Sequence, residues 1–155
     1  MQTGTEVEVL KLMIDFQRFE MVRLATGLTE EQSRWRPHDD ANSIAELMSH
    51  LAWVERWWFD HVFAGGSVDP SADPRWPGFA AAGDQPISQL IEGYWAAWQR
   101  SDEVLAGADL DTEVSTDHGP TSLRWIVVHM IEETARHAGH ADITRQMIDG
   151  FRATQ

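Results

Sequence analysis

Three polar side chains occupy positions where the helical pattern predicts apolar core residues. Glu133 and His137 are four residues apart, so on a helix their side chains differ by only about 40° around the axis and project together. His50 lies between Leu47 and Val54 at steps of three and four, on the inward stripe of another predicted helix. A buried carboxylate is costly unless it is paired or bound to a metal. Two imidazoles and one carboxylate also form the three-ligand set of catalytic zinc sites, which leave one position for water.

The same residues also have plainer interpretations. A single inward histidine is more often a hydrogen-bonded core residue than a ligand, and Glu133 with His137 fits an ordinary ion pair one turn apart. His129 and His140 compete for the ligand role, because one precedes Glu133 by four residues and the other follows His137 by three. We interpret these two as residues that orient the ligands or line the pocket. His140 is expected on the same inward stripe of the helix as Glu133 and His137. Three further histidines have no assigned role: His38, His61 and His118.

The composition of the 155-residue chain excludes several classes of protein. Acidic residues outnumber lysine and arginine by 25 to 12, and the resulting formal net charge of −13 argues against a nucleic-acid partner. Without cysteine, the chain offers no disulfide, thiolate ligand or thiol nucleophile. Apolar runs such as residues 125–128 are far shorter than the ~20 residues of a membrane span, and the polar N-terminus does not resemble a signal peptide. We therefore expect one cytoplasmic domain over residues 1–155, with no membrane partner.

Periodicity predicts four long helices that can bring the three polar residues together. They cover residues 6–26, 43–63, 87–106 and 121–149, with capping-box spacing at Thr29 and Ser43. Prolines and glycines between residues 64 and 86 predict a long connection, whose roughly 20 residues can travel the ~30 Å length of a helix. Alternation with period two is confined to residues 112–116, so the prediction needs no strand. The predicted fold class is all-α, most simply a four-helix bundle.

Two segments of the sequence resemble the DinB/YfiT-like superfamily of small metal-binding four-helix bundles, in particular an actinobacterial branch of unknown function. They read SIAELMSHLAWVERWWFDHVFAG (43–65) and LRWIVVHMIEETARHAGHADITRQMIDG (123–150), and the likeness extends over nearly the whole chain. The superfamily has one histidine in the first half of the chain and a His-x-x-x-His pair on the last long helix. His50 and His137 match the first and last ligands of this pattern. Glu133 replaces the middle histidine, a departure that still allows a divalent cation to bind.

The resemblance also implies an architecture and a chemistry. It implies that the four helices follow an up-down-down-up order and that the protein forms a homodimer. Characterised relatives include S-transferases that use mycothiol or bacillithiol, a maleylpyruvate isomerase that uses mycothiol, and metal-dependent hydrolases.

The leading hypothesis is a divalent-metal-dependent S-transferase that acts on a small molecule. In it His50, Glu133 and His137 hold Zn²⁺, with Ni, Fe or Mn as alternatives, and a low-molecular-weight thiol of the mycothiol type is the cosubstrate. Zinc deprotonates a bound thiol at neutral pH, so a chain without cysteine can still use thiolate chemistry. Two alternatives remain: a hydrolase that uses metal-bound water, and a bundle that binds a metal or ligand without catalysis.

Overall fold

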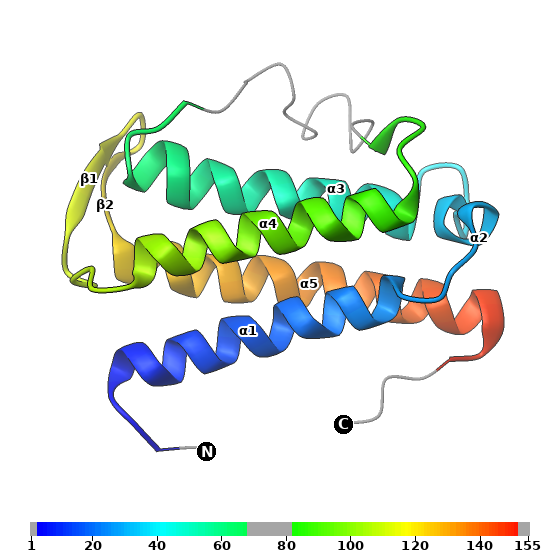
Figure 1. The fold of residues 1–155 in the computed structure, drawn as a ribbon, viewed down its shortest axis with the longest axis horizontal. Helices are drawn as coiled ribbons and strands as arrows, with labels where there is room; N and C mark the ends of the chain where they lie inside the picture. The colour runs from blue at the N-terminus through cyan, green and yellow to red at the C-terminus, as the bar shows by residue number, and fades with distance from the viewer. Residues whose placement is uncertain (1–2, 68–81, 152–155) are drawn as a thin grey trace.

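Four long helices run side by side in the computed structural model, which describes residues 3–67 and 82–151. They are α1 (Glu6–Ala25), α3 (Ile44–Glu55), α4 (Ile87–Leu105) and α5 (Leu123–Asp149). Figure 1 shows that α1 and α5 run in one direction and that α3 and α4 run in the other. The predicted all-α bundle and its up-down-down-up order are therefore confirmed. Much of the predicted loop, with Pro70, Pro74, Pro77 and Gly78, lies outside the described residues.

Local sequence signals set the ends of these helices. The side chains of Thr5, Thr29 and Ser43 each accept a hydrogen bond from the backbone N–H three residues later, and each completes a capping box. The box at Thr29 begins the short helix α2 (Glu30–Arg34), as predicted. Gly150 ends α5 with a φ of 74°, a left-handed conformation that glycine adopts without a steric penalty.

The second predicted helix changes its winding halfway along. After α3 the chain continues as a π-helix, η1 (Arg56–Phe63), and the N–H of Ala64 donates to the C=O of Phe59, five residues earlier, at 3.1 Å. Periodicity alone predicted one uniform helix over residues 43–63. In η1 the side chain of Phe59 is fully buried, whereas Trp57 and Trp58 are only partly buried.

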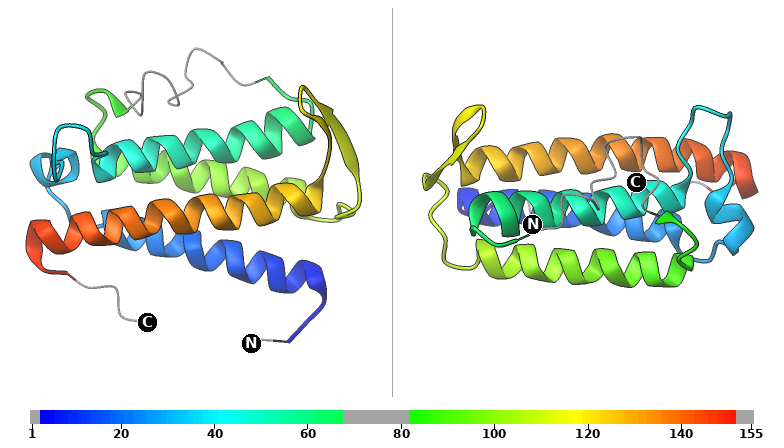
Figure 2. Two further views of the ribbon diagram at one scale, coloured as in Figure 1. Left: turned by 180° about the vertical axis from the view of Figure 1, so that it is seen from behind. Right: turned by 90° about the horizontal axis from the view of Figure 1, so that it is seen from above.

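A small β-hairpin corrects the prediction that no strand is needed. Strands β1 (Glu113–Thr116) and β2 (Gly119–Ser122) pair antiparallel, with Val114 opposite Thr121. The alternation at residues 112–116 was the sequence signal for this hairpin, but so short a run does not predict a strand by itself. The hairpin lies at the end of the bundle where η1 ends and α5 begins (Figures 1 and 2).

The core consists of two apolar clusters with a polar layer between them. One cluster lies toward α2 and contains the C-terminal half of α1 and the N-terminal half of α3, and the other lies toward the hairpin. Each long helix contributes a buried polar residue within or between the clusters: Arg18, His50, Ser101 and His137. Among the helices of residues 3–67 and 82–151, none is long and apolar enough to cross a bilayer.

A buried ion pair forms one part of the polar layer. The guanidinium of Arg18 meets the carboxylate of Glu55 through two hydrogen bonds of 2.7 Å, and both side chains are fully buried. The hydroxyl of Ser101 donates to the same carboxylate at 2.6 Å. These contacts join α1, α3 and α4, whereas the three candidate ligands lie between α3 and α5.

Candidate metal centre

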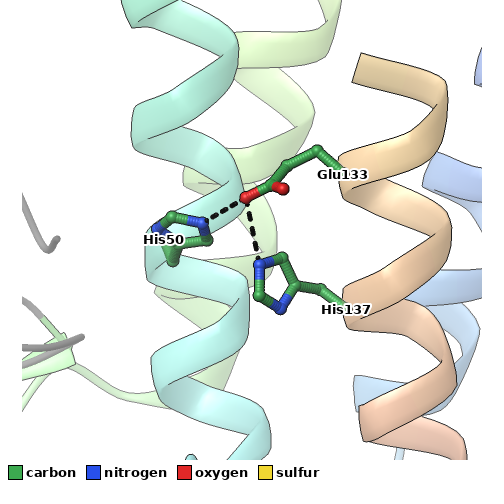
Figure 3. A group of neighbouring side chains, drawn as sticks. All are labelled: His50, Glu133 and His137. Carbon is green, nitrogen blue, oxygen red and sulfur yellow. Dashed lines mark hydrogen bonds and ion pairs between the residues drawn. The ribbon is translucent and has the colours of Figure 1, made fainter. Parts of the chain in front are cut away.

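The packing of α3 against α5 brings the three predicted ligands together. His50 projects from α3, and Glu133 and His137 project toward it from successive turns of α5 (Figure 3). One ligand atom from each side chain lies within 4.8 Å of the other two. In the part of the chain that the structure describes, this is the one cluster of three such side chains with this spacing.

The carboxylate of Glu133 is the centre of the cluster. Its Oε1 lies 3.0 Å from Nε2 of His50 and 3.1 Å from Nε2 of His137. Because a carboxylate oxygen only accepts, both imidazoles donate from Nε2. The two rings meet edge to face with their centroids 4.8 Å apart. Both histidines are buried, and the Glu133 side chain is 12% exposed, so the cluster is largely shielded from solvent.

The electrostatics favour a negative charge on Glu133. Hydrogen bonds from His137 and then His50 hold the pKa of this carboxyl well below its ordinary range, although burial acts in the opposite direction. The carboxylate is therefore ionised at neutral pH, which is the form that binds a cation. Three converging donor atoms and one negative charge fit a divalent metal, since a cation can replace the protons that the imidazoles now donate.

Arg136 also contacts Glu133, and the sequence analysis gave it no role here. Its Nη1 lies 2.9 Å from Oε2, the carboxylate oxygen that faces away from the histidines. Arg136 also pairs with Glu132. The three-residue spacing between Glu133 and Arg136 could have predicted this contact. Such spacings are common on exposed helix faces, however, and rarely identify a functional site.

The other two histidines of α5 lie at the margins of the cluster. His140 was predicted on the inward stripe, yet its side chain is exposed, with its ring centroid 5.7 Å from that of His137. The placement is wrong because three residues turn a helix by about 300°, which carries His140 toward the solvent side. His129 packs against Trp58 and Trp125, with ring centroids 5.2 and 4.9 Å away.

The three unassigned histidines lie outside the cluster. Nδ1 of His38 accepts a hydrogen bond from the N–H of Asp40 at 3.2 Å. Nδ1 of His61 lies 2.8 Å from the carbonyl oxygen of Gly66. His118 lies between the two hairpin strands and is exposed.

Comparisons with known proteins agree with this architecture. A sequence model of the mycothiol-S-transferase family matches residues 9–150. The crystal structure of a conserved protein of a locus from Enterococcus faecalis superposes with a TM-score of 0.78 and 13% sequence identity, over 96% of this chain and 100% of that one. At that identity the likeness shows the fold alone. The curated proteins contain no match to the chain. Because the family model spans nearly all of α1 through α5, the chain belongs to the mycothiol-S-transferase family.

Proposed function

We propose that the protein is a metal-dependent S-transferase that joins a low-molecular-weight thiol to a small electrophile. The observation that carries this proposal is the convergence of His50, Glu133 and His137 on one point between α3 and α5. Membership of the mycothiol-S-transferase family supports mycothiol, or a thiol like it, as the cosubstrate. The absence of cysteine from the chain is consistent with this assignment, because the nucleophilic sulfur must come from the cosubstrate.

The reaction forms a carbon–sulfur bond and breaks the bond to a leaving group. The thiol gives up its proton to solvent, its sulfur attacks the electrophilic carbon, and the leaving group departs with the bonding electron pair. A divalent cation held by the cluster would supply the charge that favours the thiolate form of the thiol. His50 and His137 would supply neutral nitrogen ligands, and Glu133 a negative oxygen ligand.

The donor set supports zinc as the metal of first choice. Two imidazoles and one carboxylate form a known catalytic zinc set that leaves a position open. The same donors also suit Ni, Fe and Mn, since geometry and supply decide metal selection in cells as much as affinity does.

Metal content tests the proposed ligands directly. We expect about one divalent cation per purified chain, measured by elemental analysis. His137→Ala should lose it, because a two-ligand site binds far more weakly. His38→Ala is the matched control, since His38 lies outside the cluster, and it should keep the metal. Equal metal in wild type and His137→Ala, or none in the wild type, would remove both the transferase and the hydrolase.

Thiol dependence separates a transferase from a hydrolase. The metal-loaded protein is incubated with an alkylating electrophile such as monochlorobimane, with and without mycothiol. Formation of the thioether only when thiol is present supports the proposed function. Consumption of an ester or amide substrate at the same rate without thiol supports the hydrolase. A loaded protein that does neither is a non-catalytic metal-binding bundle.

The assembly and location of the protein remain predictions. We propose a homodimer, as the family resemblance implies. The helices α1 and α5 pack beside each other, and both carry exposed apolar side chains. These side chains support α1 and α5 as the contact face between the two subunits. We also retain the cytoplasm as the expected compartment.

A further inference from the structure

A cavity lies at the hairpin end of the bundle, between η1 and the turn that joins β1 to β2. Its volume is about 530 Å³. That value falls within the roughly 300–1,000 Å³ of typical small-molecule sites. Trp57, Trp58 and Val62 of η1 form the apolar side of the cavity. The hairpin contributes polar residues, among them Ser115 and Asp117.

Aromatic rings extend from this cavity along two helices toward the candidate metal centre. On α3, Trp53 follows His50 by three residues, and its ring stacks on Trp57 with the centroids 5.0 Å apart. On α5, His129 precedes Glu133 by four residues and contacts Trp58, the second indole of the cavity. The seven residues from His50 to Trp57 correspond to about 10 Å along a helix, within the length of a small organic molecule.

Hydrogen bonds on the cavity wall fix which groups remain to meet a ligand. Nδ1 of His61 lies 2.8 Å from the carbonyl oxygen of Gly66, and a carbonyl only accepts. Nδ1 therefore donates to this carbonyl, and Nε2 is the ring nitrogen that remains for a ligand. The hydroxyl of Thr116 donates to the carbonyl of Gly119 at 2.8 Å and accepts from the N–H of His118. It is therefore engaged in the turn.

The groups that remain favour one charge type of ligand. The Ser115 hydroxyl and the His118 ring can each donate or accept, whereas the carboxylate of Asp117 only accepts, so a hydrogen-bond donor on the ligand finds its charged partner in Asp117. An anionic group would be repelled by Asp117 and by the net charge of −13. Indole rings on the opposite wall match an aromatic body, and they also attract organic cations.

We propose that this cavity binds the non-thiol substrate through an aromatic body that carries a hydroxyl or ammonium group. The identification of this ligand as the electrophile rests on the proposed transferase function. The binding preference itself does not, since none of the metal ligands lines the cavity.

Three probes that share a benzene ring test the preference: benzylamine, benzyl alcohol and benzoate. Each is titrated into the purified full chain, and the dissociation constant is measured by NMR chemical-shift changes. We expect saturable binding of benzylamine and benzyl alcohol, and at least fivefold weaker binding of benzoate. Asp117→Asn should weaken benzylamine about two- to fivefold and leave benzyl alcohol unchanged, because only the cation loses an ionic partner. Glu113→Gln removes the same charge from the same hairpin outside the cavity wall, and it should change neither.

Ser115→Phe provides a second, steric test. Ser115 lines the cavity, and a strand accommodates an aromatic side chain well, so the substitution should block benzylamine and benzyl alcohol together. Equal binding of benzoate and benzylamine to the wild type, undiminished binding to a folded Ser115→Phe, or no saturable binding at all would overturn the proposal. His137→Ala should bind the probes as the wild type does. The experiment thereby distinguishes an error in the proposed metal-dependent function from an error in the proposed ligand preference of the cavity.

Discussion

Arg136 holds the outer oxygen of the Glu133 carboxylate, with Nη1 at 2.9 Å from Oε2. The inner oxygen, Oε1, faces both imidazoles of the cluster. Each oxygen of this carboxylate thus has its own set of partners, and the plane of the group is fixed between them. Arg136 therefore acts as a positioning residue that turns Oε1 toward the point where a cation would bind.

Arg136→Ala should weaken metal binding without removing a ligand. Partners that orient metal ligands typically contribute about 10- to 100-fold in affinity. We expect a loss of about tenfold, because Arg136 is half exposed. Competition with a chromophoric chelator measures the affinity for Zn²⁺. Glu132→Gln is the control, since it removes the other partner of Arg136 and should change the affinity less than about twofold. Equal affinity in Arg136→Ala and wild type would contradict a positioning role.

The buried pair of Arg18 and Glu55 should be costly to break from one side. Arg18→Met leaves the Glu55 carboxylate buried with Ser101 but without its cation, and such a loss costs about 3–5 kcal/mol. Urea unfolding measures this as a lower free energy of unfolding.

Two further variants show whether the cost comes from the unpaired charge. Arg18→Met combined with Glu55→Met should recover part of the stability, because neither partner then leaves an unpaired charge at this position. Arg100→Met, which breaks an exposed pair with Asp60, should cost at most about 1 kcal/mol. A similar loss in the free energy of unfolding for Arg18→Met and Arg100→Met would show that the buried pair contributes no more to stability than the exposed one.

The elements and the His/Glu/His cluster could be predicted because their signals are local or periodic. Capping boxes and glycines marked the helix ends within a few residues. His50, Glu133 and His137 could be identified because polar side chains at core positions need polar partners. Each of these three side chains can be a partner of the other two. Family resemblance added the order of the helices, which periodicity does not contain.

Other features depend on contacts between distant residues, and no local pattern encodes them. Arg18 is fully buried although Phe16 and Phe19, two apolar neighbours on α1, are more than half exposed. Its partner Glu55 lies 37 residues away. The sequence of α1 alone therefore does not reveal that the arginine is buried and the phenylalanines are exposed. The π-helix at Arg56–Phe63 has the same three- and four-residue apolar spacing as an ordinary helix. The hairpin is too short for its alternation to stand out.

Tyr94, the only tyrosine of the chain, should resist ionisation until the protein unfolds. Burial, together with the negative charge of Glu55, raises the pKa of its phenol well above the ordinary value of about 10. The unfolded chain loses this proton near pH 10 while the folded chain keeps it. The contribution to stability is therefore present below about pH 10 and is lost as the pH rises further.

An alkaline titration checks this expectation. Tyrosinate absorbance should rise together with the loss of helical circular dichroism, rather than before it. Tyr94→Phe should lose less stability than the wild type between about pH 9 and pH 11, because it has no phenol to ionise. Tyrosinate absorbance that rises near pH 10 with the helices intact would show that the phenol is accessible.

The outer faces of α1 and α5 should form the contact between two copies of the chain. Phe16 and Phe19 of α1 are 54% and 52% exposed, and Ile143 and Met147 of α5 are 60% and 59% exposed. Large exposed apolar areas are rare on monomeric proteins, and a two-fold axis pairs the same surface on both subunits. The dimer should therefore depend on the phenyl group of Phe16.

Phe16→Glu should give a folded monomer, because each subunit would otherwise bury a carboxylate in the proposed contact face. Sedimentation velocity gives the oligomeric state, and circular dichroism shows that the helices persist. Gln89→Glu places the same charge on the exposed surface of α4 and should leave the dimer intact. A wild type that sediments as a monomer at all concentrations, or a Phe16→Glu variant that remains dimeric, would exclude this face. Since the candidate ligands come from α3 and α5 of one chain, the monomer should still bind metal, which separates assembly from the site.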